Sequence, residues 1–303
     1  MRRRDFITLV GGGVAAWPLT PRAQPERMRR IGVLVNLPQG DPQTQARLDA
    51  FRQSLAKLGW SEGRNIRVDY RFSVNTEEQG EAQAKELIVL QAEVILAHGT
   101  PAMVALRKMT RTVPIVFVVV SEPVAQGFVQ SLSHPGGNIT GFSYLEPTLG
   151  AKWLELLKEI APRVARVTTM FNPETAPNAR LFSHSAQVAA PKFAVELIES
   201  LVRDPAGIEE TMVKLAREPD GGLIVLPDVF TALHRKAIFE RAAYYRLPTI
   251  YSIPNYATEG GLIAYGVNIG DLYRRQLNMS IASCAARSQP TCRSNNRPNL
   301  SWS

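Results

Sequence analysis

The sequence predicts an α/β protein with two doubly wound, Rossmann-like lobes joined by a hinge. Short runs rich in Val and Ile alternate with segments of helical periodicity, a pattern typical of buried parallel strands separated by helices. Proline and three glycines interrupt this alternation at residues 134–143, which predicts a boundary between two lobes there. A chain of 303 residues is long enough for both lobes.

The first lobe is expected to comprise residues 28–143 and 262–275. Its predicted strands cover residues 31–35, 66–70, 94–97 and 115–120. Its predicted helices cover residues 44–58, 76–90, 101–110 and 124–132. The glycine-flanked apolar run at residues 260–266 predicts a strand that returns to this lobe.

The second lobe is expected over residues 144–261 and repeats the same layout. Its predicted helices cover residues 151–160, 178–190, 208–217 and 231–245. Its predicted strands cover residues 164–171, 193–198, 222–226 and 248–251. The sequence has two cysteines, Cys284 and Cys292, both beyond the lobes, so we expect no disulfide, thiolate metal site or cysteine nucleophile in them. We also expect no cofactor.

The N-terminus has the features of an export signal. Arg3 and Arg4 precede Phe6 and an apolar run over residues 8–19, an order similar to the twin-arginine signal of bacteria. The run is too short to span a bilayer. We therefore expect residues 1–23 to be cleaved near Ala23, which would place the protein in the periplasm. The alternative is an uncleaved N-terminal arm. A lipid anchor is not expected, because no cysteine follows the run.

The formal charge of +8 does not predict a nucleic-acid partner, because it is concentrated at the two ends of the chain. Residues 1–23 and residues 276–303 carry +3 each, which leaves +2 for residues 24–275. A nearly balanced body gives no basic surface of the kind that binds phosphate backbones.

Two strand ends carry the first candidate binding residues. The runs at residues 94–97 and 115–120 lead into Thr100-Pro101 and Glu122-Pro123, and proline is well placed at the first position of a helix. We expect two strand-to-helix turns at one sheet edge, where α/β proteins bind small ligands. Thr100, Ser121 and Glu122 are therefore candidate contacts. The alternative is that Thr100 and Ser121 only cap helices in ordinary turns.

Six further candidates lie on other predicted strand ends or near the hinge. Thr140 and Phe142 face the cleft or line the hinge, and Asn172 and Asp228 end two strands of the second lobe. Asp228 either holds a ligand ammonium or caps the following helix. The remaining two are tyrosines that either stack on an apolar ligand or pack in the core: Tyr251 and Tyr265.

Six short motifs stand along the chain: GTPA (99–102), PIVF (114–117), PV (123–124), PGGNITGFS (135–143), LPD (226–228) and GGLIAYG (260–266). Together they resemble the substrate-binding components of bacterial ABC importers, in the group that includes tryptophan and tyrosine uptake proteins. The resemblance spans residues 31–275 and implies a type I periplasmic-binding fold. Glu122 departs from the group, which more usually has Asp before Pro-Val.

The resemblance also implies a function. A small, amino-acid-like ligand would bind between the lobes, and ABC permease subunits in the membrane would be the partners. The rival class is a two-lobed α/β enzyme that acts on a small molecule. No GxSxG, GxxxxGK[ST] or HExxH motif supports catalysis, and the four histidines lie far apart in the sequence, so we do not expect an enzyme.

The last 28 residues depart most from the family. Residues 276–303 are rich in Ser, Asn and Pro without helical periodicity, whereas the family continues with an amphipathic helix and a strand. Codons for residues 282–300 can be chosen so that a reading two bases later gives ILRGAKPADLPVQQPTKL, which is similar to that continuation. We therefore expect an aberrant, disordered tail produced by a frameshift or a sequencing error. The chain would then be an impaired or non-functional copy, and the nucleotide sequence of the gene tests this.

Overall fold

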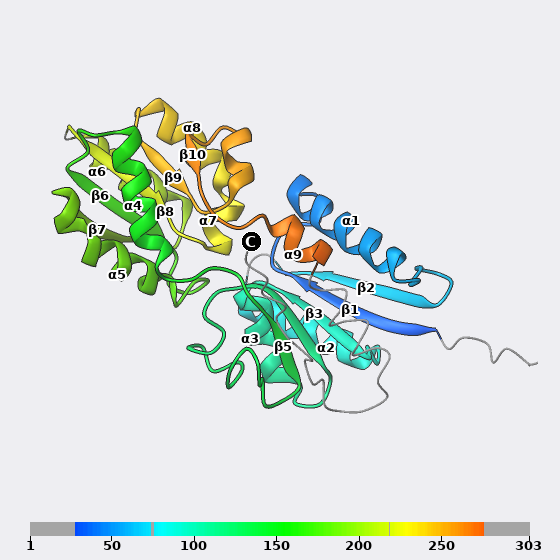
Figure 1. Ribbon diagram of the computed structural model, residues 1–303. Coiled ribbons are helices and arrows are strands. Elements are labelled where there is room, and N and C mark those ends of the chain that lie inside the picture. The colour runs from blue at the N-terminus through cyan, green and yellow to red at the C-terminus, as the bar shows by residue number, and fades with distance from the viewer. Residues whose placement is uncertain (1–27, 74–75, 218, 276–303) are drawn as a thin grey trace, which may run out of the picture.

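A computed structural model describes residues 28–73, 76–217 and 219–275 (Figure 1). The predicted export signal and the predicted out-of-frame tail lie outside the described residues. No helix within the described ranges is long and apolar enough to cross a membrane.

The first lobe contains a five-stranded parallel sheet in the order β2-β1-β3-β4-β5. Its strands are β1 (Arg29–Val35), β2 (Ile66–Phe72), β3 (Val94–His98), β4 (Ile115–Val120) and β5 (Ile139–Ser143). Its helices are α1 (Pro42–Lys57), α2 (Glu77–Val89), α3 (Thr100–Met109) and, after the return of the chain, α9 (Ile269–Arg275).

Helices cover both faces of this sheet because successive side chains on a strand point to opposite sides. On β1, Val33 and Val35 belong to the same apolar cluster as Leu48 and Phe51 of α1. The intervening Leu34 belongs to the cluster formed with α2 and α3. A strand that is buried on both faces needs a continuous apolar run, and this explains the Val- and Ile-rich sequences of β3 and β4.

The second lobe contains a parallel sheet in the order β10-β9-β8-β6-β7. Its strands are β6 (Arg166–Phe171), β7 (Glu196–Leu201), β8 (Gly221–Val225), β9 (Thr249–Tyr251) and β10 (Ile263–Ala264). Its helices are α4 (Leu149–Ile160), α5 (Ala179–Ala189), α6 (Pro205–Ala216), α7 (Val229–Leu233) and α8 (Arg235–Tyr244). Two 3-10 turns complete it, η1 (Ala190–Phe193) and η2 (Pro254–Thr258). The predicted α/β class with two lobes is confirmed.

One predicted helix of the first lobe is wrong. Residues 124–132 form turns rather than a helix. Glu122 and Gly127 both have positive φ, 50° and 66°. A right-handed helix needs negative φ, so it cannot continue through either residue. Only one of the two expected strand-to-helix turns therefore exists, at Thr100.

The strand predicted to return to the first lobe belongs to the second sheet. Ile263 and Ala264 form β10, which pairs in parallel with β9. The chain returns to the first lobe only with α9, whose Ile269, Leu272 and Tyr273 are buried in the same apolar cluster as α1. Residue 262 is therefore too early for the boundary. The single helix predicted over residues 231–245 is also divided, because α7 ends before His234 and α8 begins after it.

Candidate functional site

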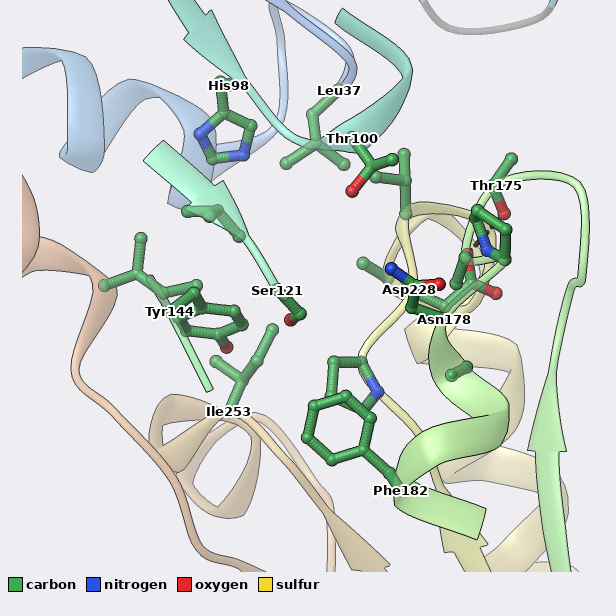
Figure 2. A pocket seen from close by; sticks show the side chains of 18 of the residues that line it. Leu37, His98, Thr100, Ser121, Tyr144, Thr175, Asn178, Phe182, Asp228 and Ile253 are labelled. Atoms are coloured by element: carbon green, nitrogen blue, oxygen red, sulfur yellow. Dashed lines mark hydrogen bonds between the residues drawn. The ribbon is translucent and has the colours of Figure 1, made fainter. Parts of the chain in front are cut away.

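A cavity lies between the two lobes, at the carboxyl ends of strands from both sheets (Figure 2). The first lobe contributes residues that follow β3, β4 and β5. The second lobe contributes the start of α5 and the turn between β8 and α7. Because β3, β4 and β5 are neighbours in the sheet, their parallel arrangement brings Thr100, Ser121 and Tyr144 to one edge.

Thr100 opens α3 directly behind a glycine that shapes the turn. Gly99 has a φ of 88°, which an L-residue with a side chain rarely adopts, and Pro101 occupies the start of the helix. A methyl group at Gly99 would also stand 3.4 Å from Val229 of the second lobe. The positive φ of Gly99 thus shapes the turn that places Thr100 on the cavity wall.

The end of β4 is irregular where it meets the cavity. The pairing of β4 with β5 shifts between Phe117 and Val120, and Val119 has a φ of 59°, an unusual angle for a β-branched residue. Val119 and Ser121 both line the cavity. Bulges of this kind redirect side chains near binding sites. The irregularity therefore places two residues of one strand end on the same wall.

Tyr144 and Asn178 present unpaired polar groups from opposite lobes. Tyr144 follows β5, is only 5% exposed, and its hydroxyl has no hydrogen-bond partner among the described residues. Asn178 precedes α5, makes no capping bond, and its buried Nδ2 also lacks a partner within the described ranges. Figure 2 shows both side chains directed into the cavity. A buried polar group without a partner costs about 1–3 kcal/mol, so a ligand that pairs with both groups would stabilise this arrangement.

Asp228 lines the cavity, but its carboxylate is occupied by the protein. It accepts hydrogen bonds from the backbone N–H groups of Asn172 (2.9 Å), Phe230 (3.0 Å) and Thr231 (3.4 Å), and from the hydroxyl of Thr175. Burial raises the pKa of Asp228, while these hydrogen bonds act in the opposite direction. The geometry favours the helix cap over the ammonium partner, the two roles that the sequence left open.

Arg47 is a buried cation that sequence reasoning missed. It lies on α1, is 8% exposed, and borders both this cavity and a hollow beside α9. Its Nη2 donates to Oε1 of Gln43 at 2.6 Å. A signal was available in the sequence, because Arg47 occupies the same face of α1 as Leu48, Phe51 and Leu55, where an apolar residue is the rule.

His98 ends β3 and faces the cavity as a neutral ring. Burial lowers its pKa to about 3, and the nearby charge of Arg47 acts in the same direction. Its Nδ1 lies 2.6 Å from the hydroxyl of Tyr273 on α9. In the described part of the chain no three His, Cys, Asp or Glu side chains gather as metal ligands would.

Three of the nine predicted contacts line the cavity: Thr100, Ser121 and Asp228. Tyr251 packs instead against Phe239 in the core of the second lobe, with ring centres 4.9 Å apart. Tyr265 is 44% exposed, and its carbonyl accepts a hydrogen bond from the indole of Trp153. The others are not among the lining residues: Glu122, Thr140, Phe142 and Asn172.

The apolar walls of the cavity come from both lobes. Phe182 of α5 stacks on Trp153 of α4, with ring centres 5.5 Å apart and planes inclined by 28°. Further apolar side chains lie around the polar groups: Leu37, Val119, Val229, Ile253 and Ile269. The cavity therefore combines hydrophobic walls with a few convergent polar groups, the usual composition of a small-molecule site.

Comparisons with known proteins agree with this architecture. The family model of ABC transporter substrate-binding proteins matches residues 30–277. A tyrosine-binding protein of Clostridioides difficile strain R20291 is 26% identical over 219 residues, which are 72% of this chain and 62% of the relative. This chain thus spans less than two thirds of that relative's length.

Solved structures share the fold over both lobes. A conserved domain protein from Vibrio cholerae has a TM-score of 0.79 at 24% identity, with 88% of each chain covered. An ABC domain from Streptococcus pneumoniae in complex with L-Trp has a TM-score of 0.77 at 20% identity, with 87% of each chain covered. Through its match to the family model over both lobes, the chain belongs to the family of ABC transporter substrate-binding proteins, and it has their type I periplasmic-binding fold.

Proposed function

We propose that this protein is the solute-binding component of an ABC importer and that it closes around a small ligand in the cavity between its lobes. One observation carries the proposal: the hydroxyl of Tyr144 and the amide Nδ2 of Asn178 are buried, have no partner within residues 28–73, 76–217 and 219–275, and are directed into the same cavity from opposite lobes. A ligand bonded to both groups stabilises the closed arrangement in preference to an open one, which is how hinge closure is coupled to binding.

Transport is favoured over catalysis by the state of Asp228. General acid–base catalysis needs a carboxylate that can reach a ligand proton, and Asp228 is held by four protein donors. Proteins of this family are extracytoplasmic. For this chain we propose export by residues 1–23, cleavage near Ala23 and delivery of the ligand to permease subunits in the membrane.

The test is thermal melting of the purified protein with a panel of amino acids, organic acids and sugars. The names of two similar proteins, one tyrosine-binding and one solved with L-Trp, justify including the aromatic amino acids. A ligand at 100 times its Kd adds about 2.7 kcal/mol, which raises Tm by several degrees.

Two variants locate the binding site in the same assay. Tyr144→Phe and Asn178→Ala should each reduce the shift, because each removes one of the two unpaired groups. Tyr244→Phe is the matched control, since Tyr244 is 73% exposed on α8. A cooperative melt that no compound moves would contradict the proposal, as would a ligand shift that all three variants leave unchanged.

A further inference from the structure

We infer that the ligand of this cavity is a carboxylate with an apolar body and no ammonium group, and that Arg47 binds its carboxylate. This inference rests on the proposed function and specifies the chemical class of the ligand. It follows from the charges on the cavity wall, from the two groups left unpaired there and from the apolar surface between them.

Two arginines are buried among the described residues, and they differ in their partners. Arg235 is 7% exposed and forms ion pairs with two carboxylates, those of Asp41 and Glu259. Arg47 is equally buried at 8%, yet its hydrogen-bond partner is the neutral amide oxygen of Gln43. In the described part of the chain, no carboxylate lies within 4.0 Å of the Arg47 nitrogens.

A buried cation without an anion is costly, because its lost hydration is not replaced by a charge of opposite sign. Guanidinium groups bind carboxylates through two parallel hydrogen bonds, which makes arginine suited to this role. Since Arg47 borders the cavity, a carboxylate on the ligand is the partner that the protein itself does not supply.

The cavity has no corresponding site for an ammonium group. Among the lining residues that the structure describes, Asp228 is the one carboxylate, and protein donors occupy both of its oxygens. Glu122 follows Ser121 in the chain but is not part of the lining. An ammonium group in this cavity would therefore be buried without a free anion beside it, at a cost of the same kind that Arg47 now carries.

The rest of the lining fits an apolar carboxylate. The hydroxyls of Thr100, Ser121 and Tyr144 and the amide of Asn178 can all donate hydrogen bonds, as the oxygens of a carboxylate and of a ring substituent require. The body of the ligand would lie against apolar side chains from both lobes: Leu37, Val119, Phe182, Val229, Ile253 and Ile269.

The test compares three matched compounds by titration calorimetry with the full chain: 3-phenylpropionate, L-phenylalanine and 2-phenylethylamine. They share one apolar body and carry a carboxylate, both groups, or only the ammonium. A second set adds a ring hydroxyl: 3-(4-hydroxyphenyl)propionate, L-tyrosine and tyramine. We expect the plain carboxylate of at least one set to bind about tenfold or more tightly than its amino acid, and the amines not to bind.

The methyl ester of 3-phenylpropionate tests Arg47 without altering the protein. It keeps the shape of the ligand and removes its charge, so we expect affinity to fall by about 100-fold. Arg47→Met should have the same effect on the carboxylate while leaving the Tm of the ligand-free protein equal or higher, because an uncompensated buried charge is removed. Arg52→Met is the control on the same helix, since Arg52 pairs with Asp49 and Tyr70 and does not line the cavity.

The outcomes separate this inference from the function on which it rests. An amino acid that binds more tightly than its matched carboxylate, an amine that binds, or an ester as good as the acid would overturn the inference and leave the solute-binding role intact. A sugar or another uncharged compound as the sole ligand would do the same. If no member of the wider panel binds, the proposed function fails as well.

Discussion

Arg235 at the start of α8 forms an ion pair across the lobes with Asp41, the residue that caps α1. Their side chains are only 8% and 9% exposed, and Nε of Arg235 also lies 2.9 Å from a carboxylate oxygen of Glu259. Gln43 of α1 donates to the other oxygen of Glu259, so a second contact joins the lobes at the same place. These contacts can form only when the lobes are close together.

We expect Asp41→Asn to weaken ligand binding by favouring the open arrangement. Asparagine still caps α1, so the change removes the charge across the lobes with little effect on the helix. The variant removes the charge pair between the lobes, while Arg235 keeps its ion pair with Glu259 in the second lobe. The closed arrangement therefore loses a stabilising contact that the open arrangement does not have. Ligand Kd, measured by calorimetry, should rise by about tenfold, and the radius of gyration of the free protein should increase.

Glu209→Gln provides the control for this pair. It breaks an ion pair, 2.9 Å to Arg241, that lies wholly within the second lobe. Equal Kd values for the two variants would show that the Asp41–Arg235 pair does not contribute to closure.

The pKa of Asp41 predicts the pH range over which the Asp41–Arg235 pair favours the closed arrangement. Burial acts to raise the pKa of Asp41, but the hydrogen bond and charge of Arg235 and the bonds of Thr44 outweigh it and lower the pKa below 3.8. The stabilisation of the closed arrangement by this pair is therefore complete above pH 3.8, and it is lost as pH falls through the lowered pKa of Asp41. Between pH 5 and 8, the ratio of the Kd values of Asp41→Asn and the wild type should stay constant.

His98 should make the protein less stable in mild acid. Its pKa is lowered to about 3 by burial, whereas the unfolded side chain titrates near 6.5. Between these values the unfolded state binds the extra proton, so the free energy of unfolding falls as pH drops below 6.5. From pH 7.5 to 5.5 this group alone should cost about 1.4 kcal/mol.

Urea unfolding of the wild type and His98→Asn at both pH values measures this effect. The variant should lose less stability between them than the wild type, because it lacks the titrating ring. His134→Asn is the matched control, since His134 is exposed in the loop before β5. A pH dependence that is the same in all three proteins would contradict the assignment.

Tyr273 should hold α9 against the first lobe through the same histidine. Its hydroxyl lies 2.6 Å from Nδ1 of His98, and the side chain is 1% exposed. Tyr273→Phe leaves that nitrogen buried without a partner, so we expect a loss of about 1–3 kcal/mol in the free energy of unfolding. Tyr244→Phe, at an exposed tyrosine, should have no such effect in the same urea titration, and equal losses would contradict the role of the hydrogen bond.

The sequence predicted the elements that depend on local patterns. The β-branched runs of β3 and β4 and the proline after Thr100 are local signals, and they correctly located two strand ends and one helix start. The turn after β4 was missed because backbone angles at Glu122 and Gly127, rather than composition, stop a helix there. The pairing of β10 was missed because a two-residue strand carries no signal of which sheet it joins.

The binding site was harder to predict because it forms between lobes. Thr100, Ser121 and Asp228 were predicted from their position at strand ends alone, and all three line the cavity. Arg47 lies in the middle of a helix, and Asn178 is brought opposite Tyr144 only by the packing of one lobe against the other. Tyr251, placed at a strand end by the same rule, points instead into the core beside Phe239.

Gly150 should be intolerant of even one methyl group. It lies in the first turn of α4, and a Cβ there would stand 1.9 Å from the carbonyl oxygen of Phe182 on α5. Helix propensity alone would make Gly150→Ala favourable by about 1 kcal/mol, but the clash forces α4 and α5 apart and reverses the sign. We expect a net loss of about 1–3 kcal/mol, measured by urea unfolding.

The displacement should also reach the binding site, because Phe182 lines the cavity. Gly150→Ala should therefore weaken ligand binding as well as the fold. Gly137→Ala is the control, since a Cβ at Gly137 meets no atom within 4 Å. If the two alanine variants have the same stability and the same ligand Kd, α4 and α5 are not packed at the distance that the structure shows, and the wall formed by Phe182 is not held as rigidly as we infer.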